Sequence, residues 1–201
     1  MRRLGDALGV VPMAIYNHVA SKDKLLDGMI DTVFSEIDLP DPSSDWKLAL
    51  RQVAISARAA LSRHQWAIGL LESRTSPGAE NLRQHDAVLG CLREAGFSLQ
   101  AATRAYSVLN SYTYGYALQE KYRPFTTPEE LEQLIEGLPR SFEEEYPYLA
   151  ELVVEISSSV AERRKSGFDT SARFESALDL ILGSVERLRH RPRGRQAKRK
   201  R

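Results

Sequence analysis

The sequence predicts an all-α protein built from a small N-terminal module and a larger helical body. Apolar residues recur at helical spacing in nearly every interval between glycine and proline breakers, and no strand-length run of alternating β-branched residues is convincing. Of the 201 residues, 42 % are apolar and 27 % are charged, which are ordinary proportions for a soluble globular protein. No segment repeats along the chain, which argues against a solenoid.

Simple features exclude several classes of protein. No apolar run approaches the roughly 18 residues needed to cross a bilayer. The first residues, Met-Arg-Arg-Leu-Gly-Asp, lack the apolar core and cleavage site of a secretory signal. Cys91 is the sole cysteine and has no partner for an internal disulfide, as is usual in a reducing compartment. We therefore expect a cytoplasmic protein with no membrane contact.

The N-terminal module is predicted over residues 1–38. Two short helices, Met1–Leu8 and Pro12–Val19, are separated by a three-residue turn in which Gly9 suits a left-handed backbone. Ser21 is a favourable N-cap for a third helix with a long apolar face. The Pro-rich segment Leu-Pro-Asp-Pro-Ser-Ser-Asp that follows breaks the helical pattern and marks a module boundary.

The body is predicted over residues 45–189. Trp46 opens an amphipathic helix of about five turns, and Gly96 suits a left-handed C-cap. Ser98 begins a long helix that runs to about Lys121. Further helices are expected at 65–73, 79–95, 128–137, 147–165 and 168–189.

Charge is distributed unevenly along the chain. The net charge is +1, but residues 187–201 hold nine Lys and Arg and no acid, which leaves 19 basic against 27 acidic residues before them, a net of −8. An acidic body repels nucleic acid, so contacts with DNA must come from the ends of the chain. The basic tail, 190–201, is expected to be disordered. It either attracts DNA phosphates without sequence preference or stays solvated without a role.

Two short helices around a glycine turn are typical of a helix-turn-helix, although many enzyme helices meet in the same way. The exposed face of the second helix would place Met13 and Asn17 near base edges in the major groove, where Asn pairs with adenine and a thioether contacts thymine. Phosphate contacts are expected from polar and basic side chains nearby: Tyr16, His18, Lys22, Arg2 and Arg3.

Residues 2–27 closely resemble the DNA-binding module of the TetR family of bacterial repressors, through the pieces Leu-Gly-Val, Tyr-x-His-Val and Ser-Lys-Asp-x-Leu-Leu-Asp. The body resembles the C-terminal domain of the tetracycline-repressor branch, through Trp46, Arg58-Ala-Ala-Leu, Glu72-Ser-Arg, Ala95-Gly-Phe-Ser and Ser111-Tyr-Thr-Tyr-Gly. The resemblance implies a homodimer that binds operator DNA with two reading heads and a small-molecule effector in its body. By position it implies DNA contacts from Pro12, Met13, Ala14, Tyr16, Asn17, His18 and Lys22.

Two departures from the family pattern matter. The chain starts at what would be the family's second helix, so no counterpart of the family's first helix is expected. Val11 precedes the second helix, at a position where the family usually has Ser, Thr or Glu. This helix therefore lacks a side-chain N-cap, at a cost of about 1 kcal/mol. The buried seam between the two helices, which would be partly uncovered, is expected to comprise Leu4, Leu8, Val10, Ile15 and Val19. A dimeric small-molecule-binding protein without DNA binding therefore stays open as an alternative.

Effector cavities of this kind are mostly apolar with few polar groups. Arg74 matches a position that lines the tetracycline site, whereas Leu70 and Gln119 stand where that branch uses a histidine and a glutamate near its Mg²⁺, so no effector is predicted. Further candidates are aromatic and polar residues of the body: His64, Trp66, Glu72, Asn81, His85, Asn110, Tyr112, Tyr114 and Tyr116. Each has a structural alternative, because tyrosines at helical spacing suit a core or dimer seam and histidines suit a helix surface.

The helices 98–121 and 168–189 are the expected dimer surface, where two helices from each subunit would form a four-helix bundle. Small residues in the first of them, including Gly115, allow close approach, although both faces could instead pack within one chain. Catalysis is not expected, because the sequence holds no metal-binding His motif and no Gly-rich phosphate loop, and Cys91 is interpreted as a structural thiol. No cofactor or metal is expected.

Overall fold

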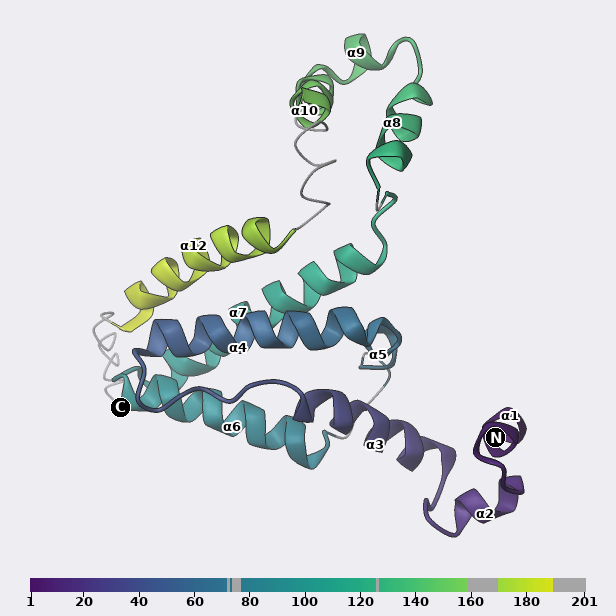
Figure 1. Ribbon diagram of the computed structural model, residues 1–201. Coiled ribbons are helices and arrows are strands. Elements are labelled where there is room, and N and C mark those ends of the chain that lie inside the picture. Colours follow the sequence, from purple (N-terminus) through teal and green to yellow (C-terminus); the bar gives the residue numbers. More distant parts are fainter. Residues whose placement is uncertain (72, 74–76, 126, 159–169, 190–201) are drawn as a thin grey trace, which may run out of the picture. The chain divides into compact units, whose positions relative to one another are not determined.

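The computed structural model describes residues 1–71, 73, 77–125, 127–158 and 170–189, and every regular element in these ranges is an α-helix (Figure 1). The prediction of an all-α fold is confirmed. No described helix is both long enough and apolar enough to span a membrane. In chain order the helices are α1 (Arg2–Leu8), α2 (Pro12–Tyr16), α3 (Lys22–Ser35), α4 (Trp46–Arg63), α5 (Gln65–Leu71), α6 (Ala79–Glu94), α7 (Leu99–Lys121), α8 (Pro128–Glu136), α9 (Phe142–Glu145), α10 (Pro147–Ser158) and α12 (Ser171–Arg189).

Several predicted helices have shorter bounds in the structure. The helix expected at 12–19 ends at Tyr16, and the helix expected at 65–73 ends at Leu71. The single turn of α9 is an addition to the predicted set. The expected helix end near residue 165 and the expected disorder of the basic tail concern residues that lie outside the described ranges.

Contacts divide the chain into two units, Met1–Leu118 with Glu175–Arg201, and Gln119–Phe174. In the second unit, the side chain of Thr127 accepts a hydrogen bond from the backbone of Glu130, and the Glu130 side chain accepts one from the backbone of Thr127. This reciprocal capping box satisfies two backbone donors and fixes the start of α8.

The core of the first unit lies among α4, α6, α7 and the described part of α12. Phe97, which precedes α7, is 1 % exposed and packs edge-on against Trp46 with ring centroids 5.0 Å apart. Ala101, Ala102 and Ala105 form a buried face of small residues on α7, which lets neighbouring helices approach closely. The largest fully buried side chains of this unit are Phe97, Ile68, Leu92 and Leu178.

Helix ends in the body follow the capping signals of the sequence. Asp45 accepts a hydrogen bond from the backbone N–H of Lys47 at the start of α4, and Ser98 accepts one from Ala101 at the start of α7. Gly96 has a φ of +90°, so the predicted left-handed glycine after α6 is confirmed.

Helix α3 caps the N-terminus of α6 with a side chain. One oxygen of Asp31 accepts hydrogen bonds from the backbone N–H groups of Glu80 (2.9 Å) and Asn81 (3.2 Å). These are two of the donors that a helix start leaves without partners inside the helix. Gly78 makes room for the carboxylate, because a Cβ at that position would lie 2.2 Å from the Asp31 oxygen. The position of α3 and the start of α6 therefore depend on each other.

Ion pairs connect other helices of the same unit. Glu36, directly after α3, binds Arg63 at 2.8 Å and His64 at 2.7 Å at the end of α4. The Arg51 guanidinium of α4 binds two carboxylates of α12, those of Glu175 (2.7 Å) and Asp179 (2.9 Å). A guanidinium fork that meets two carboxylates fixes the relative position of the two helices better than a point charge would.

Candidate functional sites

The turn between α1 and α2 has the geometry expected from its glycine. Gly9 has a φ of +68°, in the left-handed region, and its N–H bonds back to the carbonyl of Asp6. Gly5 fulfils a second requirement that residue spacing does not reveal. It is buried, and a Cβ there would lie 2.7 Å from the carbonyl oxygen of Val10. The turn therefore requires glycine at both positions, at Gly9 for its backbone conformation and at Gly5 for the close approach of Val10.

The residues predicted to contact DNA lie on and after α2. Pro12 and Ala14 are half-buried. The exposed members of the set are Met13, Tyr16, Asn17, His18 and Lys22. Because α2 ends at Tyr16, Asn17 and His18 lie in the turn that follows the helix rather than inside it. No other described residue forms a side-chain hydrogen bond or ion pair with the polar members of this group, so their polar atoms are available to a partner.

The seam between α1 and α2 is smaller than predicted. Ile15 is buried at 7 % exposure, and Leu4 and Val19 are half-buried. Leu8 and Val10 are 61 % and 42 % exposed, so the expectation that they belong to the seam is wrong. They flank the left-handed Gly9 turn, and no described element packs over that side of it.

The predicted effector-binding residues fall into separate groups. His64 bonds to Glu36, and its ring lies 5.9 Å from that of Trp66, which is 42 % exposed. Neither residue lines the cavities that contain Asn110. Arg74 and Glu72 lie outside the described residues.

Two cavities adjoin Tyr106, and we call them the Tyr106 cavities. The larger has a volume of about 290 Å³ and is lined by Phe34, Leu71, Asn81, Tyr106, Asn110 and Tyr114. The smaller has a volume of about 40 Å³ and lies among α4, α6 and α7. Tyr106 and Asn110 line both. Of the predicted candidates, the structure thus brings Asn81, Asn110 and Tyr114 together at one site.

Aromatic stacking and hydrogen bonds shape the walls of these cavities. The His85 ring stacks on Tyr106 with centroids 3.9 Å apart, and burial raises the pKa of the Tyr106 hydroxyl. The Tyr114 hydroxyl donates to the carbonyl oxygen of Ile68 at 2.5 Å. Tyr114 therefore has a structural role, because it connects α7 to α5, and it also lines the larger cavity as an effector-binding residue would.

Sequence reasoning missed Gln84, which lines the smaller cavity and is 8 % exposed. Val88 and Leu92 follow it at spacings of four and are also buried, so Gln84 occupies a core position of α6. A polar residue on the buried stripe of an amphipathic helix is the signal that could have found it.

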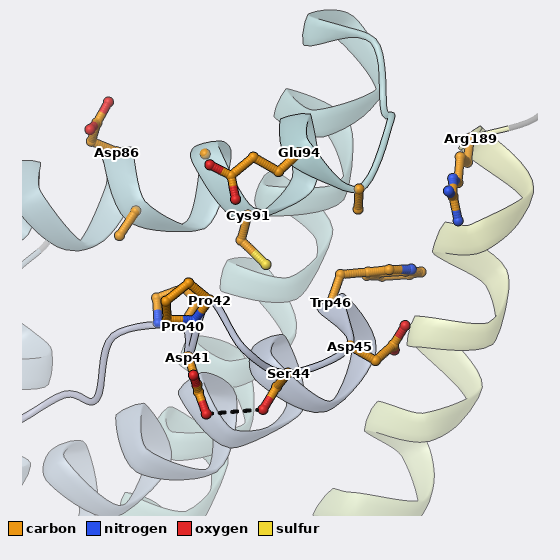
Figure 2. A pocket seen from close by; sticks show the side chains of 13 residues that line it. Pro40, Asp41, Pro42, Ser44, Asp45, Trp46, Asp86, Cys91, Glu94 and Arg189 are labelled. Carbon is orange, nitrogen blue, oxygen red and sulfur yellow. Dashed lines mark hydrogen bonds between the residues drawn. The ribbon is translucent and has the colours of Figure 1, made fainter.

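A third cavity, of about 530 Å³, lies between the C-terminal half of α6 and the segment that leads into α4 (Figure 2). Four carboxylates line it, those of Asp41, Asp45, Asp86 and Glu94, together with the half-buried Cys91. Burial raises the pKa of the Cys91 thiol, and the charges of Glu94 and Asp45 raise it further. This is the opposite of what activates a cysteine nucleophile, which agrees with the interpretation of Cys91 as a structural thiol. No group of three or more His, Cys, Asp and Glu in the described ranges is arranged to hold a metal ion.

An apolar groove of about 350 Å³ runs between α7 and α12. Leu180 in this groove is 74 % exposed and Val108 is 48 % exposed. The other lining residues are Ile181, Ser184, Val185 and Leu188. The groove joins the two helices that the sequence assigns to a dimer surface.

Comparison with known proteins agrees with this architecture. The family described as "Tetracyclin repressor-like, C-terminal domain" matches residues 39–189. An HTH-type transcriptional regulator of Saccharopolyspora erythraea is 32 % identical over 152 residues, which span 75 % of this chain and 64 % of that protein, less than two thirds of its length. Tetracycline repressor protein class C of Escherichia coli is 29 % identical over 191 residues, which span 94 % of this chain and 81 % of the repressor.

A solved structure shares the fold. The Streptomyces coelicolor TetR family protein ActR in complex with actinorhodin superposes with a TM-score of 0.72 over 95 % of this chain and 88 % of that chain, at 22 % identity. The match of the family over residues 39–189 carries the assignment, and the shared fold is consistent with it. The chain belongs to the tetracycline-repressor (TetR) family of transcriptional regulators.

Proposed function

We propose that this chain is a ligand-responsive, dimeric transcriptional regulator that binds operator DNA through α1 and α2 and an effector through the Tyr106 cavities. The observation that carries the proposal is the position of α3. This helix follows the two short N-terminal helices, contributes Phe34 to the wall of the larger cavity, and caps α6 through Asp31. Family membership and the names of the relatives as regulators support the same function.

Most of the proposed DNA contacts are exposed side chains, and the polar ones form no side-chain hydrogen bond or ion pair with another described residue. Asn17 suits a bidentate contact with adenine, and Met13 suits an apolar contact with the thymine methyl group. Tyr16, His18 and Lys22 suit phosphates, which fix the register of the protein on the duplex. Pro12 and Ala14, which are half-buried, suit close packing of the helix start against the groove.

The proposed effector site is lined by uncharged residues among those described. Asn81, Asn110 and Tyr114 supply polar atoms, and Phe34 and Leu71 supply apolar contacts. The His85 ring stacks on Tyr106. One relative is named for tetracycline, and the ActR structure contains actinorhodin. At positions where the tetracycline branch uses a histidine and a glutamate, this chain has Leu70 and Gln119, so the proposal names no effector.

Effector and DNA would be coupled through α3. A ligand that enters the larger cavity contacts Phe34 of α3 and Asn81 of α6, the two helices that Asp31 connects. It can shift the population of conformations only if it binds one arrangement of these helices better than the other. We propose that the effector-bound arrangement moves α3. The α1–α2 modules of the two subunits then no longer match two operator half-sites about one helical turn of DNA apart.

Dimerisation would use the groove between α7 and α12. Leu180 and Val108 expose apolar surface there that a second copy of the chain would cover. A twofold contact places the same groove of both subunits face to face and forms an intermolecular four-helix bundle. The spacing of the reading heads is then set by the bodies.

Selection of genomic fragments by the purified chain tests the DNA-binding function. We expect enrichment of fragments near its own gene that contain an inverted repeat, with affinity that falls steeply as salt rises. Asn17→Ala should weaken binding to the selected site about tenfold or more. Gln100→Ala, exposed on α7, is the matched control and should bind like the wild type. Retention of no fragment above the level of an unrelated protein would contradict DNA binding.

One observation favours the second candidate, a dimeric small-molecule-binding protein without DNA binding. Leu8, Val10, Val11 and Met13 are all exposed apolar residues around the α1–α2 turn in the described structure. Uncovered apolar surface weakens so small a module. A chain that dimerises and binds ligand but enriches no DNA would support this candidate.

A further inference from the structure

Gln84 is a buried polar residue without a hydrogen-bond partner among the residues that the structure describes. Its exposed fraction is 8 %, and no hydrogen bond joins its carboxamide to any described residue. The other buried polar side chain of this region, Thr113, differs in that its hydroxyl donates to the carbonyl of Leu109 at 2.9 Å. Buried polar groups in folded proteins nearly always have a hydrogen-bond partner, so an exception calls for an explanation.

The smaller Tyr106 cavity lies next to Gln84. Its volume of about 40 Å³ holds about one water molecule or one ligand group of similar size. Apart from Gln84, Tyr106, Asn110 and Thr113, its lining is apolar: Leu50, Val53, Ala54, Ala57, Val88 and Leu109. A carboxamide can donate two hydrogen bonds and accept others, so it can pair with a hydroxyl, a carbonyl or an amide.

The two Tyr106 cavities suggest the shape of a ligand. The larger, about 290 Å³, has Phe34, Tyr106 and Tyr114 on its walls and suits a planar apolar body. Tyr106 and Asn110 line both cavities, so a ligand in the larger cavity would lie next to the smaller cavity, which Gln84 lines. No charged side chain lines either cavity in the described part of the chain, which disfavours an ionised ligand.

We propose that Gln84 is a specificity-determining residue of the effector site, which pairs with one hydrogen-bonding group at the end of an uncharged aromatic effector. The inference rests on the proposed function in one respect, that the Tyr106 cavities bind the effector. It adds that effectors lacking a polar group at that end are rejected, because they leave the buried carboxamide unpaired. The unpaired amide of the ligand-free protein is then a cost in stability that ligand binding removes.

The first test measures thermal stability without ligand. Gln84→Met replaces the carboxamide with an apolar side chain of similar size. It should raise the melting temperature by roughly 2–4 °C, because the unpaired polar group is gone. Gln52→Met, the same substitution at an exposed site of α4, is the matched control and should leave the melting temperature unchanged. A fall in the melting temperature of Gln84→Met would show that the amide has a structural partner and would overturn the proposal.

The second test compares 2-naphthol with naphthalene, two aromatic molecules that differ by one hydroxyl group. The wild-type chain should prefer 2-naphthol, and Gln84→Met should reduce that preference about tenfold, measured as the ratio of the two dissociation constants. Gln52→Met should retain the wild-type ratio. An unchanged ratio in Gln84→Met would overturn the role of Gln84 and leave the effector site standing. Failure of both compounds to bind the wild-type chain would instead contradict the Tyr106 cavities as a ligand site, and with it the proposed function.

Discussion

Cys91 illustrates at the residue scale how local surroundings set chemistry. Burial raises the pKa of its thiol, and the negative charges of Glu94 and Asp45 add to the effect. Only the thiolate reacts with alkylating agents, so modification at pH 7 should be slower in the folded chain than in the chain unfolded by urea. In the folded chain, the rate of alkylation should still be rising at pH values at which an ordinary cysteine is already fully ionised.

Two variants separate the causes. Glu94→Gln removes one of the charges that oppose ionisation and should speed the modification at pH 7. Asp86→Asn changes a carboxylate of the same cavity that does not contribute to the shift, and it should leave the rate unchanged. Faster modification of the folded wild type than of the unfolded chain would contradict this account of Cys91.

Residue-scale prediction from sequence succeeded where a residue type determines the local backbone conformation. Gly9 and Gly96 occupy left-handed conformations because of what glycine allows, and both could be predicted. Asn110 and Tyr114 line one cavity, and their part in binding an effector stays a prediction. Gly5 could not be predicted, because its requirement comes from a carbonyl oxygen on the neighbouring turn, which only the folded arrangement brings within reach.

At the scale of elements, the connection between α3 and α6 makes a strong prediction. Asp31→Ala removes the acceptor for two backbone N–H groups of α6 and should destabilise the chain by about 1–2 kcal/mol. Gly78→Ala should also destabilise it, because a Cβ would lie 2.2 Å from the Asp31 oxygen and 2.3 Å from its Cγ. Urea unfolding measures both effects.

The double variant provides the control for that prediction. Without the carboxylate the two shortest contacts of a Cβ at position 78 disappear and one at 2.8 Å remains, so Gly78→Ala should cost less in the Asp31→Ala background than in the wild type. Additive effects would mean that the two residues act independently and that Asp31 does not determine the backbone at Gly78.

A second element-scale prediction concerns the carboxylate after α3. Hydrogen bonds from Arg63 and His64 lower the pKa of Glu36 below its ordinary value of 4.5. A carboxyl whose pKa is lower in the folded chain stabilises folding above the unfolded pKa and loses that effect as the pH falls through the folded pKa. Glu36→Gln should therefore be less stable than the wild type at pH 7, and the difference should shrink below about pH 4.5. Urea midpoints at pH 7 and pH 3 measure it, and a difference that grows on acidification would contradict it.

The elements themselves were the most predictable part of the fold. Amphipathic spacing and caps located α4, α6 and α7 to within a few residues, since breakers and capping residues are local signals. The end of α2 was not predictable, because Asn17 and His18 continue the helical pattern without the packing that would hold them in a helix. The tie between Asp31 and α6 joins residues 49 and 50 positions apart and leaves no trace in sequence spacing.

At the scale of the whole molecule, the groove between α7 and α12 predicts a dimer that can be broken without unfolding the chain. Nothing lies within 4 Å of a Cβ at Gly115, so a side chain can begin there without a clash, and Gly115→Trp should block the approach of a second copy. Leu180 is 74 % exposed, so Leu180→Glu should also be tolerated by the monomer. Light scattering should give each variant the mass of one chain, 22.6 kDa, and the wild type twice that value.

Gly69→Trp is the control for the dimer prediction. Gly69 is exposed on α5, and a Cβ there also has no neighbour within 4 Å. It lies on a helix that the proposed interface does not include, so this variant should keep the wild-type mass. If Gly115→Trp and Leu180→Glu both keep that mass too, the interface lies elsewhere.

The most direct measurement of the central claim is the mass of the complex formed with DNA. The chain would be mixed with a duplex that carries the inverted repeat found by genomic selection, and sedimentation velocity would give the composition of the complex. We expect two chains on each duplex with both half-sites, and no such complex for Asn17→Ala or for a shuffled duplex of the same composition. Equal binding to the shuffled duplex, or no complex with either, would contradict the account of this chain as a dimeric, operator-binding regulator.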